Sequence, residues 1–124
     1  KQAVDIVLFA MEKALGGEIF VPKLPSYRIL DLAEAIGPEC RTEIIGIRHG
    51  EKIHEEMITR ADALNTYDLG KYYAILPPVT NFALAEFLSH HRGKLVPDGF
   101  SYQSGENIEW LTVDQIRHLV TNIE

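Results

Sequence analysis

The order of helical and strand patterns in the first 47 residues most constrains the fold of this chain. Between Ala3 and Leu15, apolar residues recur at spacings of three and four, which is typical of an amphipathic helix. The expected apolar stripe comprises Ala3, Val4, Val7, Leu8, Met11, Ala14 and Leu15. Gly16 and Gly17 predict the end of that helix, because glycine commonly follows the last helical residue. Residues 18–22 then predict a short buried strand.

A second helix and a second strand are expected next. Ser26 is a candidate N-cap for a helix over residues 27–36, which Gly37 and Pro38 would end. Four residues of this helix are expected to face the core: Ile29, Leu30, Ala33 and Ile36. Residues 42–47 predict the second strand. Because helices and strands alternate with short connections, we expect an α/β layer structure with locally parallel strands.

The rest of the chain is less regular until its final helix. Three elements are expected before that helix: a short helix spanning Ile53 and Met57, a strand over residues 72–76, and a packed apolar segment over residues 82–88. Residues 60–70 and 90–107 are expected to form polar turns and irregular loops. Thr112 and Gln115 have the spacing of a capping box and predict the final helix. Its apolar face would comprise Ile116, Leu119, Val120 and Ile123.

The composition argues against several classes of function. A net charge of −6, with no stripe of Lys and Arg, argues against a nucleic-acid partner. No apolar run approaches the roughly 18 residues of a membrane-spanning helix, so we expect a soluble, cytoplasmic protein. Cys40 is the single cysteine, so no disulfide can form within the chain and an oxidising compartment gains no support.

At 124 residues, the chain has the size of one small domain or of a piece of a larger protein. It begins without Met, and its first helix has no visible cap, so we expect a chain cut from something longer. No strand is followed by the G-x-G-x-x-G turn of dinucleotide-binding domains, and neither a P-loop nor a G-x-S-x-G motif occurs. The sequence therefore shows no catalytic machinery of its own.

The segment around Arg48 has the residue types of a nucleotide-binding turn. Arg48 follows the expected second strand and can contact phosphate oxygens with two parallel, charge-assisted hydrogen bonds. Glu51 carries an acceptor suited to the paired hydroxyls of a ribose, and Gly50 permits the positive φ of a sharp turn. The local spacing alone favours the alternative of a surface ion pair after a strand.

Lys23 is a second candidate for binding an anion. It lies between two prolines at the end of the first expected strand, which would direct its ammonium group outward. Ligands of open α/β sheets bind beyond the carboxyl ends of strands, so Lys23 and Arg48 are expected at one sheet edge as a diphosphate site. The alternative is a solvated lysine on a proline-rich turn.

Two other groups of residues are weaker candidates. His49 and His54 are five residues apart with Gly50 between them, which does not match the helical spacing of a zinc protease, so no metal site is predicted. His90 and His91 are expected to be a solvated loop pair.

Tyr67 and Lys71 match the tyrosine-x-x-x-lysine spacing of a pair in which the lysine lowers the tyrosine pKa for proton transfer during hydride chemistry. Gly70 and the polar residues before Tyr67 disfavour the stable helix on which such a pair works, so no catalytic role is assigned.

Four blocks of the chain together resemble one enzyme family: residues 17–26, 31–33, 44–55 and 102–111. They are similar to the carboxyl-terminal part of inverting UDP-N-acetylglucosamine 4,6-dehydratases, which open the pseudaminic acid pathway of bacterial surface glycans. These enzymes are extended short-chain dehydrogenase/reductases. One departure is His49, where the family pattern has proline.

The resemblance implies that residues 1–124 form a single partial domain. In the family, an amino-terminal Rossmann domain carries NADP and the catalytic residues, and the carboxyl-terminal portion holds the nucleotide sugar. By that resemblance Arg48 would contact the diphosphate and Glu51 the ribose, with Lys23 as a second cation. The segment itself would bind no cofactor, and its Rossmann core is expected upstream. The parent would be a lyase.

Two other interpretations stay open. One is a UDP-sugar epimerase on the same scaffold, and the other is a stand-alone, non-catalytic α/β binding module. Beside the UDP-sugar and the Rossmann domain, a second copy of the protein is a candidate partner. Without its Rossmann half, the segment is expected to expose an apolar surface where that domain packs.

Overall fold

The structure is a computed structural model that describes residues 2–122, and it divides the chain into two compact units. The sheet unit comprises Lys1–Lys23 and Met57–Ser101, and the helix-pair unit comprises Leu24–Glu56 and Tyr102–Glu124. Each unit is therefore built from two stretches that are distant in sequence.

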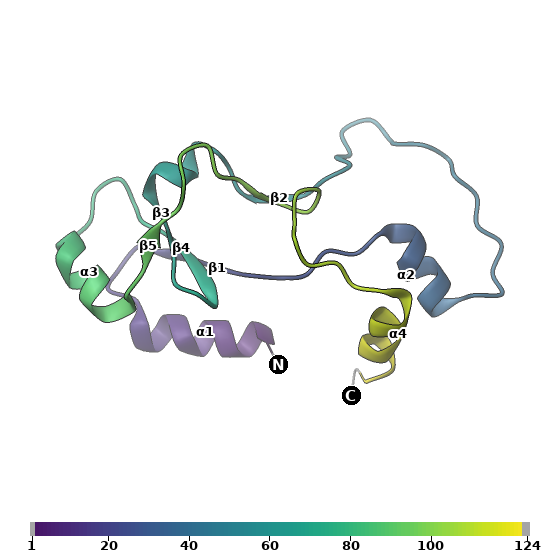
Figure 1. Ribbon diagram of the computed structural model, residues 1–124, viewed down its shortest axis with the longest axis horizontal. Helices are drawn as coiled ribbons and strands as arrows, with labels where there is room; N and C mark the ends of the chain where they lie inside the picture. The colour runs from purple at the N-terminus through teal and green to yellow at the C-terminus, as the bar shows by residue number, and fades with distance from the viewer. Residues whose placement is uncertain (1, 123–124) are drawn as a thin grey trace. The chain divides into compact units, whose positions relative to one another are not determined.

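The sheet unit has a four-stranded antiparallel sheet with the strand order β1-β4-β3-β5. Its elements are α1 (Gln2–Lys13), β1 (Ile19–Pro22), the 3-10 turn η1 (Asp62–Asn65), β3 (Thr66–Asp68), β4 (Tyr72–Ile75), α3 (Leu84–His91) and β5 (Lys94–Leu95). The expected helix, strand and apolar segment at α1, β1 and α3 are confirmed, as is the strand at β4. The expectation of parallel strands is wrong, because β1 pairs with the distant β4 and runs opposite to it (Figure 1).

The core of this unit forms where β4 meets α3. Ala74 in the centre of β4 and Phe87 in α3 are fully buried, and Leu76 is buried beside them. Ala74 lies opposite Phe20 of β1 and opposite Tyr67 of β3, so both neighbouring strands contribute an aromatic ring to the same core. Alternation along the strand thus places apolar residues inward, as expected for a sheet with one buried face.

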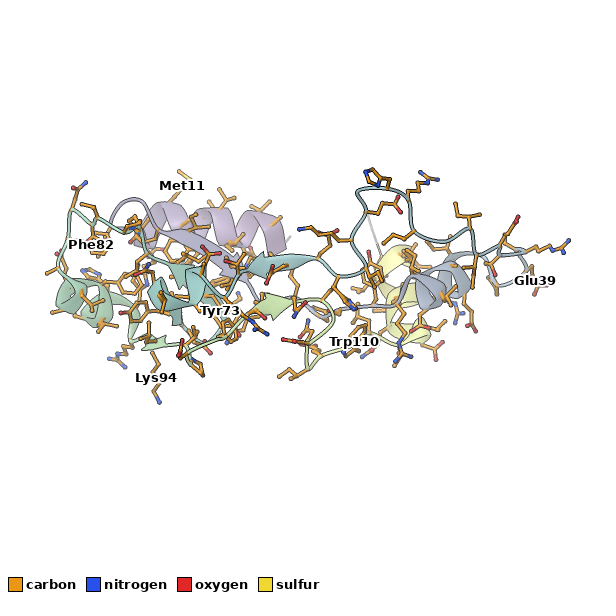
Figure 2. All side chains as sticks on the ribbon, turned by 90° about the horizontal axis from the view of Figure 1, so that it is seen from above. Met11, Glu39, Tyr73, Phe82, Lys94 and Trp110 are labelled. Carbon is orange, nitrogen blue, oxygen red and sulfur yellow. The ribbon has the colours of Figure 1, made fainter. Side chains whose placement is uncertain are left out.

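Helix α1 faces the sheet with a different side from the one expected. Phe9 packs on Phe20 and Tyr72, with ring centroids 5.2 and 4.8 Å apart. The expected stripe lies largely in solvent, since Val4, Val7, Leu8 and Met11 are 57–80% exposed. Figure 2 shows Met11 on the side of α1 away from the sheet. The helix is apolar on two sides, and the side that carries Phe9 packs on the aromatic rings of the sheet. The expected exposed apolar surface is therefore present on α1.

The helix-pair unit is built around the packing of α2 (Ile29–Ile36) against α4 (Val113–Thr121), which lie side by side in Figure 1. Ala35 and Ile116 are the buried residues of these two helices. The capping box is confirmed: the Thr112 hydroxyl accepts from the Gln115 N–H, and the Gln115 side chain accepts from the Thr112 N–H. Strand β6 (Tyr102–Gln103) precedes α4, and β2 (Glu56–Ile58) begins in this unit.

Several details of α2 and α4 differ from expectation. Ser26 is not the N-cap; α2 starts at Ile29 after Arg28, and Ser26 instead forms a parallel bridge with Trp110. Three residues of the expected inward face are 55–72% exposed: Ile29, Leu30 and Ile36. On α4, Leu119 is also largely exposed, and Ile123 lies outside the described residues. With only one helix packed against α2, a short helix buries just one narrow side.

The predicted strand over residues 42–47 and the short helix near 53–57 are both wrong. Every residue from 41 to 57 is exposed, and β2 is the first regular element after α2. Ile44 is 83% exposed, so the apolar residues that suggested a buried strand lie in solvent. A strand forms only where another strand pairs with it, and no such partner lies here within residues 2–122. The architecture is a mixed α/β fold with antiparallel pairing.

None of the helices in the described part of the chain has the length and apolarity to cross a membrane.

His91 is half-buried rather than the solvated loop residue that was expected. Its ring packs on Phe87 with centroids 4.6 Å apart, and its Nε2 lies 3.1 Å from the carbonyl oxygen of Lys13, at the end of α1. Burial lowers the pKa of His91 below its ordinary value, although the Lys13 carbonyl and the Glu18 carboxylate act in the opposite direction.

Protonation of His91 is therefore expected to destabilise the sheet unit. The unfolded chain binds this proton more tightly than the folded chain, so the free energy of unfolding should fall as the pH falls below about 6.5. Urea unfolding across this pH range measures the effect. His91→Gln should flatten the dependence, whereas the exposed neighbour variant His90→Gln, which removes only a smaller repulsive contribution to the lowered His91 pKa, should flatten it much less. Equal pH dependence in wild type and His91→Gln would contradict the assignment.

Candidate functional site

The residues from Arg48 to Glu51 form a tight turn. The Glu51 N–H donates to the Arg48 carbonyl at 3.1 Å, which closes a four-residue turn with His49 and Gly50 at its centre. Gly50 has a φ of +88°, and Arg92 is the only non-glycine residue with positive φ in the described chain. Positive φ at the third residue alone is the signature of a type II turn. The expected glycine hinge is confirmed.

The side chains of this turn face one another loosely. The Arg48 N–H donates to Glu51 Oε2 at 2.9 Å, whereas Arg48 Nε lies 3.9 Å from Glu51 Oε1. The second distance is longer than a hydrogen bond, and the two side chains are 75% and 51% exposed. An exposed pair of this kind contributes about 0–1 kcal/mol, so the guanidinium remains available to an anion at little cost. The surface ion pair and the ligand-binding interpretation are both compatible with this geometry.

A shallow polar depression adjoins the turn. It has a volume of about 380 Å³ and is lined by Gly50, Glu51, Lys52 and Glu55. The strand that was expected to deliver Arg48 is absent, so a turn in an exposed segment presents these residues instead of a sheet edge.

Lys23 is engaged within the sheet unit. Its Nζ donates to Asp68 Oδ1 at 2.7 Å and lies 4.5 Å from the centre of the Tyr73 ring. Burial raises the pKa of Asp68, but hydrogen bonds from Lys23 and from the Gly70 N–H outweigh it, so that pKa lies below its ordinary value. Lys23 follows β1 as expected, but no strand precedes Arg48, so the premise of two adjacent strand ends is wrong.

The Tyr67–Lys71 pair and the candidate metal ligands were the weaker candidates from the sequence. Tyr67 lies in β3 and Lys71 lies in the turn before β4, so the two do not share a helix face, as the sequence indicated. Within residues 2–122, no group of three His, Cys, Asp or Glu side chains is arranged to hold a metal ion.

Sequence reasoning missed a set of hydrogen bonds made by residues 102–111. Ser104 and Glu55 are linked by two hydrogen bonds, and Tyr102 and Asn107 both contact the backbone of Leu24. The partners are 49 to 83 residues apart, so no local pattern reports them. The block of resemblance at 102–111 was the available signal.

Comparison with known proteins supports a specific family. A family model described as "Polysaccharide biosynthesis protein" matches residues 1–77. The inverting UDP-N-acetylglucosamine 4,6-dehydratase of Campylobacter jejuni is 39% identical over 130 residues, which cover 100% of this chain and 38% of that protein. The UDP-glucose 4-epimerase of Rickettsia akari is 31% identical over 128 residues, which cover 98% of this chain and 36% of that protein.

A solved structure has a similar fold. The X-ray structure of Pen from Bacillus thuringiensis matches with a TM-score of 0.75 and 28% identity, over 98% of this chain and 36% of that one. The chain thus spans well under half the length of the relatives it matches, and the matched part of the dehydratase is its carboxyl-terminal portion.

The type II geometry predicts that proline would suit position 49. Proline fixes φ near −65°, which is the value required at the second residue of such a turn. It also reduces the number of conformations available to the segment when the hydrogen bond of the turn is broken. His49→Pro should slow hydrogen exchange of the Glu51 amide about two- to fivefold, as measured by NMR. His49→Ala is the control and should leave the rate near that of the wild type. Faster exchange in His49→Pro would show that the turn has another geometry.

Proposed function

This chain belongs to the polysaccharide biosynthesis protein family, and on that premise we propose that it is the UDP-sugar-binding portion of an NADP-dependent UDP-N-acetylglucosamine 4,6-dehydratase. The observation that carries the proposal is 39% identity to an inverting dehydratase over the entire chain. The Arg48–Glu51 turn supports it, because an exposed arginine beside a carboxylate on a tight turn suits a nucleoside diphosphate.

The proposed parent reaction is an internal redox sequence on the sugar. Bound NADP would supply reversible hydride transfer, and the net change on the sugar would be a ketone at C4, loss of water across C5 and C6 to leave a methyl group at C6, and inversion at C5. The portion of the parent outside this chain would bind NADP and carry the acid, the base and the hydride chemistry. The contribution of this chain is to hold the UDP group, so that the sugar stays in place through the successive steps.

Arg48 and Glu51 have distinct roles in this proposal. The Arg48 guanidinium binds the diphosphate, and Glu51 accepts hydrogen bonds from the ribose hydroxyls through Oε1, while Oε2 keeps the Arg48 N–H. Lys23 belongs to the sheet unit, where a short hydrogen bond to Asp68 holds its ammonium group. The proposal therefore assigns the diphosphate to Arg48 and gives Lys23 no contact with it.

The exposed stripe of α1 supports a larger parent. Four large aliphatic side chains in a row, Val4, Val7, Leu8 and Met11, form the kind of patch that a partner or a neighbouring domain covers. We assign that contact to the NADP-binding domain of the parent. A second copy of the protein is the alternative occupant.

Arg48→Ala in the full-length protein is expected to weaken UDP binding about 10- to 100-fold, because charge-assisted hydrogen bonds to the diphosphate are lost. NADP affinity should be unchanged. Arg41→Ala removes an exposed arginine from the same segment and is the matched control. Isothermal titration calorimetry measures both affinities, and wild-type UDP affinity in Arg48→Ala would overturn the assignment of the turn.

The second candidate function is UDP-sugar 4-epimerisation, which the 31% identity to the Rickettsia epimerase favours. The product separates the two activities. Incubation of the full-length protein with UDP-N-acetylglucosamine should give a 6-deoxy-4-keto sugar, seen by NMR as a new methyl doublet. A product that keeps its C6 hydroxyl and differs only at C4 would establish the epimerase instead.

A further inference from the structure

Residues 102–111 cross the chain that leads into α2, all within the helix-pair unit. The Tyr102 hydroxyl accepts from the Leu24 N–H at 2.6 Å and donates to the Leu24 carbonyl at 2.8 Å. The Asn107 amide donates to the same carbonyl at 2.6 Å and to Ser26 Oγ at 3.1 Å. The side chains of Tyr102 and Asn107 thus fix the two peptide groups on either side of Leu24, in the connection that leads to α2.

Backbone pairing reinforces this crossing. The Ser26 N–H donates to the Glu109 carbonyl at 2.9 Å, and the Leu111 N–H donates to the Ser26 carbonyl at 2.8 Å, one on each side of the bridge to Trp110. Ser26 is buried, and its hydroxyl donates to the Ser104 carbonyl at 3.0 Å. Figure 1 shows the stretch between β6 and α4 crossing the stretch between β1 and α2, and Figure 2 labels Trp110, which belongs to the first of these stretches.

The same segment also holds the far end of the loop that carries Arg48. The Ser104 N–H donates to the Glu55 carbonyl at 2.8 Å, and the Glu55 N–H donates to Ser104 Oγ at 3.1 Å. The His54 ring lies directly over Gly105, where an added Cβ would come within 2.7 Å of His54 Nδ1. Glycine at position 105 therefore allows a close approach that any larger residue would obstruct.

These contacts bracket the nucleotide-binding turn. The loop from Gly37 to Glu55 begins at the end of α2, which packs on α4, and ends at Glu55, which bonds Ser104 immediately before β2 pairs with β6. Residues 41–57 are exposed throughout, so the loop does not gain its position from burial in a core. Hydrogen bonds at its end are then the means by which the turn at Arg48–Glu51, four residues before Glu55, is held in place.

We propose that the segment Tyr102–Leu111 is a positioning element for the UDP-binding turn, with Ser104 holding Glu55 and with Tyr102 and Asn107 holding the strand-to-helix connection at Leu24–Ser26. The proposal rests on the proposed function for its ligand, UDP, but its geometry stands on the hydrogen bonds alone. The proposal gives Ser104 no contact with the ligand. It acts through Glu55 and is a positioning residue.

Ser104→Ala in the full-length protein tests whether the hydrogen bond between Ser104 and Glu55 positions the Arg48–Glu51 turn. It removes the acceptor of the Glu55 N–H and leaves the backbone bond to the Glu55 carbonyl. Hydrogen exchange of the Glu55 and Glu51 amides, measured without substrate, should rise about fivefold. UDP affinity should fall about fivefold, while NADP affinity and kcat at saturating sugar stay near wild type. Ser104→Thr keeps the hydroxyl and should restore both values.

Matched variants separate positioning from general destabilisation. Ser89→Ala removes an exposed serine hydroxyl that donates to the Glu86 carbonyl, and Tyr27→Phe removes the hydroxyl of an exposed tyrosine in the helix-pair unit. Both should behave as wild type, whereas Tyr102→Phe should raise exchange at the Leu24 amide.

Unchanged exchange at Glu55 and Glu51 in Ser104→Ala would overturn the inference. So would faster exchange with wild-type UDP affinity, provided that Arg48→Ala lowers that affinity. If Arg48→Ala leaves UDP affinity intact, the proposed function fails and the exchange measurement alone decides whether Ser104 positions the turn.

Discussion

Antiparallel pairing of β1 with β4 is the interaction on which the sheet unit depends. It joins residues 19–22 to residues 72–75 and puts Phe20 opposite Ala74, around which the core with Phe87 assembles. Aligning such distant segments costs loop-closure entropy, which grows only slowly with loop length. A sizeable insertion between the paired strands is therefore tolerated, and in this chain the insertion includes α2 and the candidate binding turn.

The helix-pair unit also joins segments that are distant in sequence, and it does so with hydrogen bonds more than with burial. Residues 24–26 and 55 are held by residues 102–111, and α2 rests on α4 with few buried side chains. Hydrogen bonds depend on direction, whereas apolar packing does not. A unit held in this way can place an exposed turn accurately without enclosing it, which suits a site that must receive a ligand from solvent.

The candidate site combines a rigid backbone with loosely held side chains. Gly50 permits the type II turn, and the Glu51 carboxylate binds the Arg48 N–H, so the backbone of the turn is defined from within. The guanidinium makes only a long contact with Glu51 and stays in water. Lys23 is the opposite case, because a short hydrogen bond to Asp68 and the face of Tyr73 hold its ammonium group.

The sequence alone determined local features. Among the elements, these are the helices α1, α2 and α4 and the strands β1 and β4. Among the details, they are the capping box of Thr112, the positive φ of Gly50, and the presence of an arginine and a carboxylate three residues apart at Arg48 and Glu51. Each depends on residues a few positions apart, where backbone propensity and short-range hydrogen bonds decide the outcome. Only the tertiary structure decided that the strands of the sheet are antiparallel and that residues 42–47 form no strand. It also decided three contacts: the salt bridge between Lys23 and Asp68, the partial burial of His91, and the hydrogen bond between Ser104 and Glu55. Those outcomes depend on which distant segment packs against each residue. The residues near an apolar or charged side chain in the sequence do not indicate which distant residue it will contact.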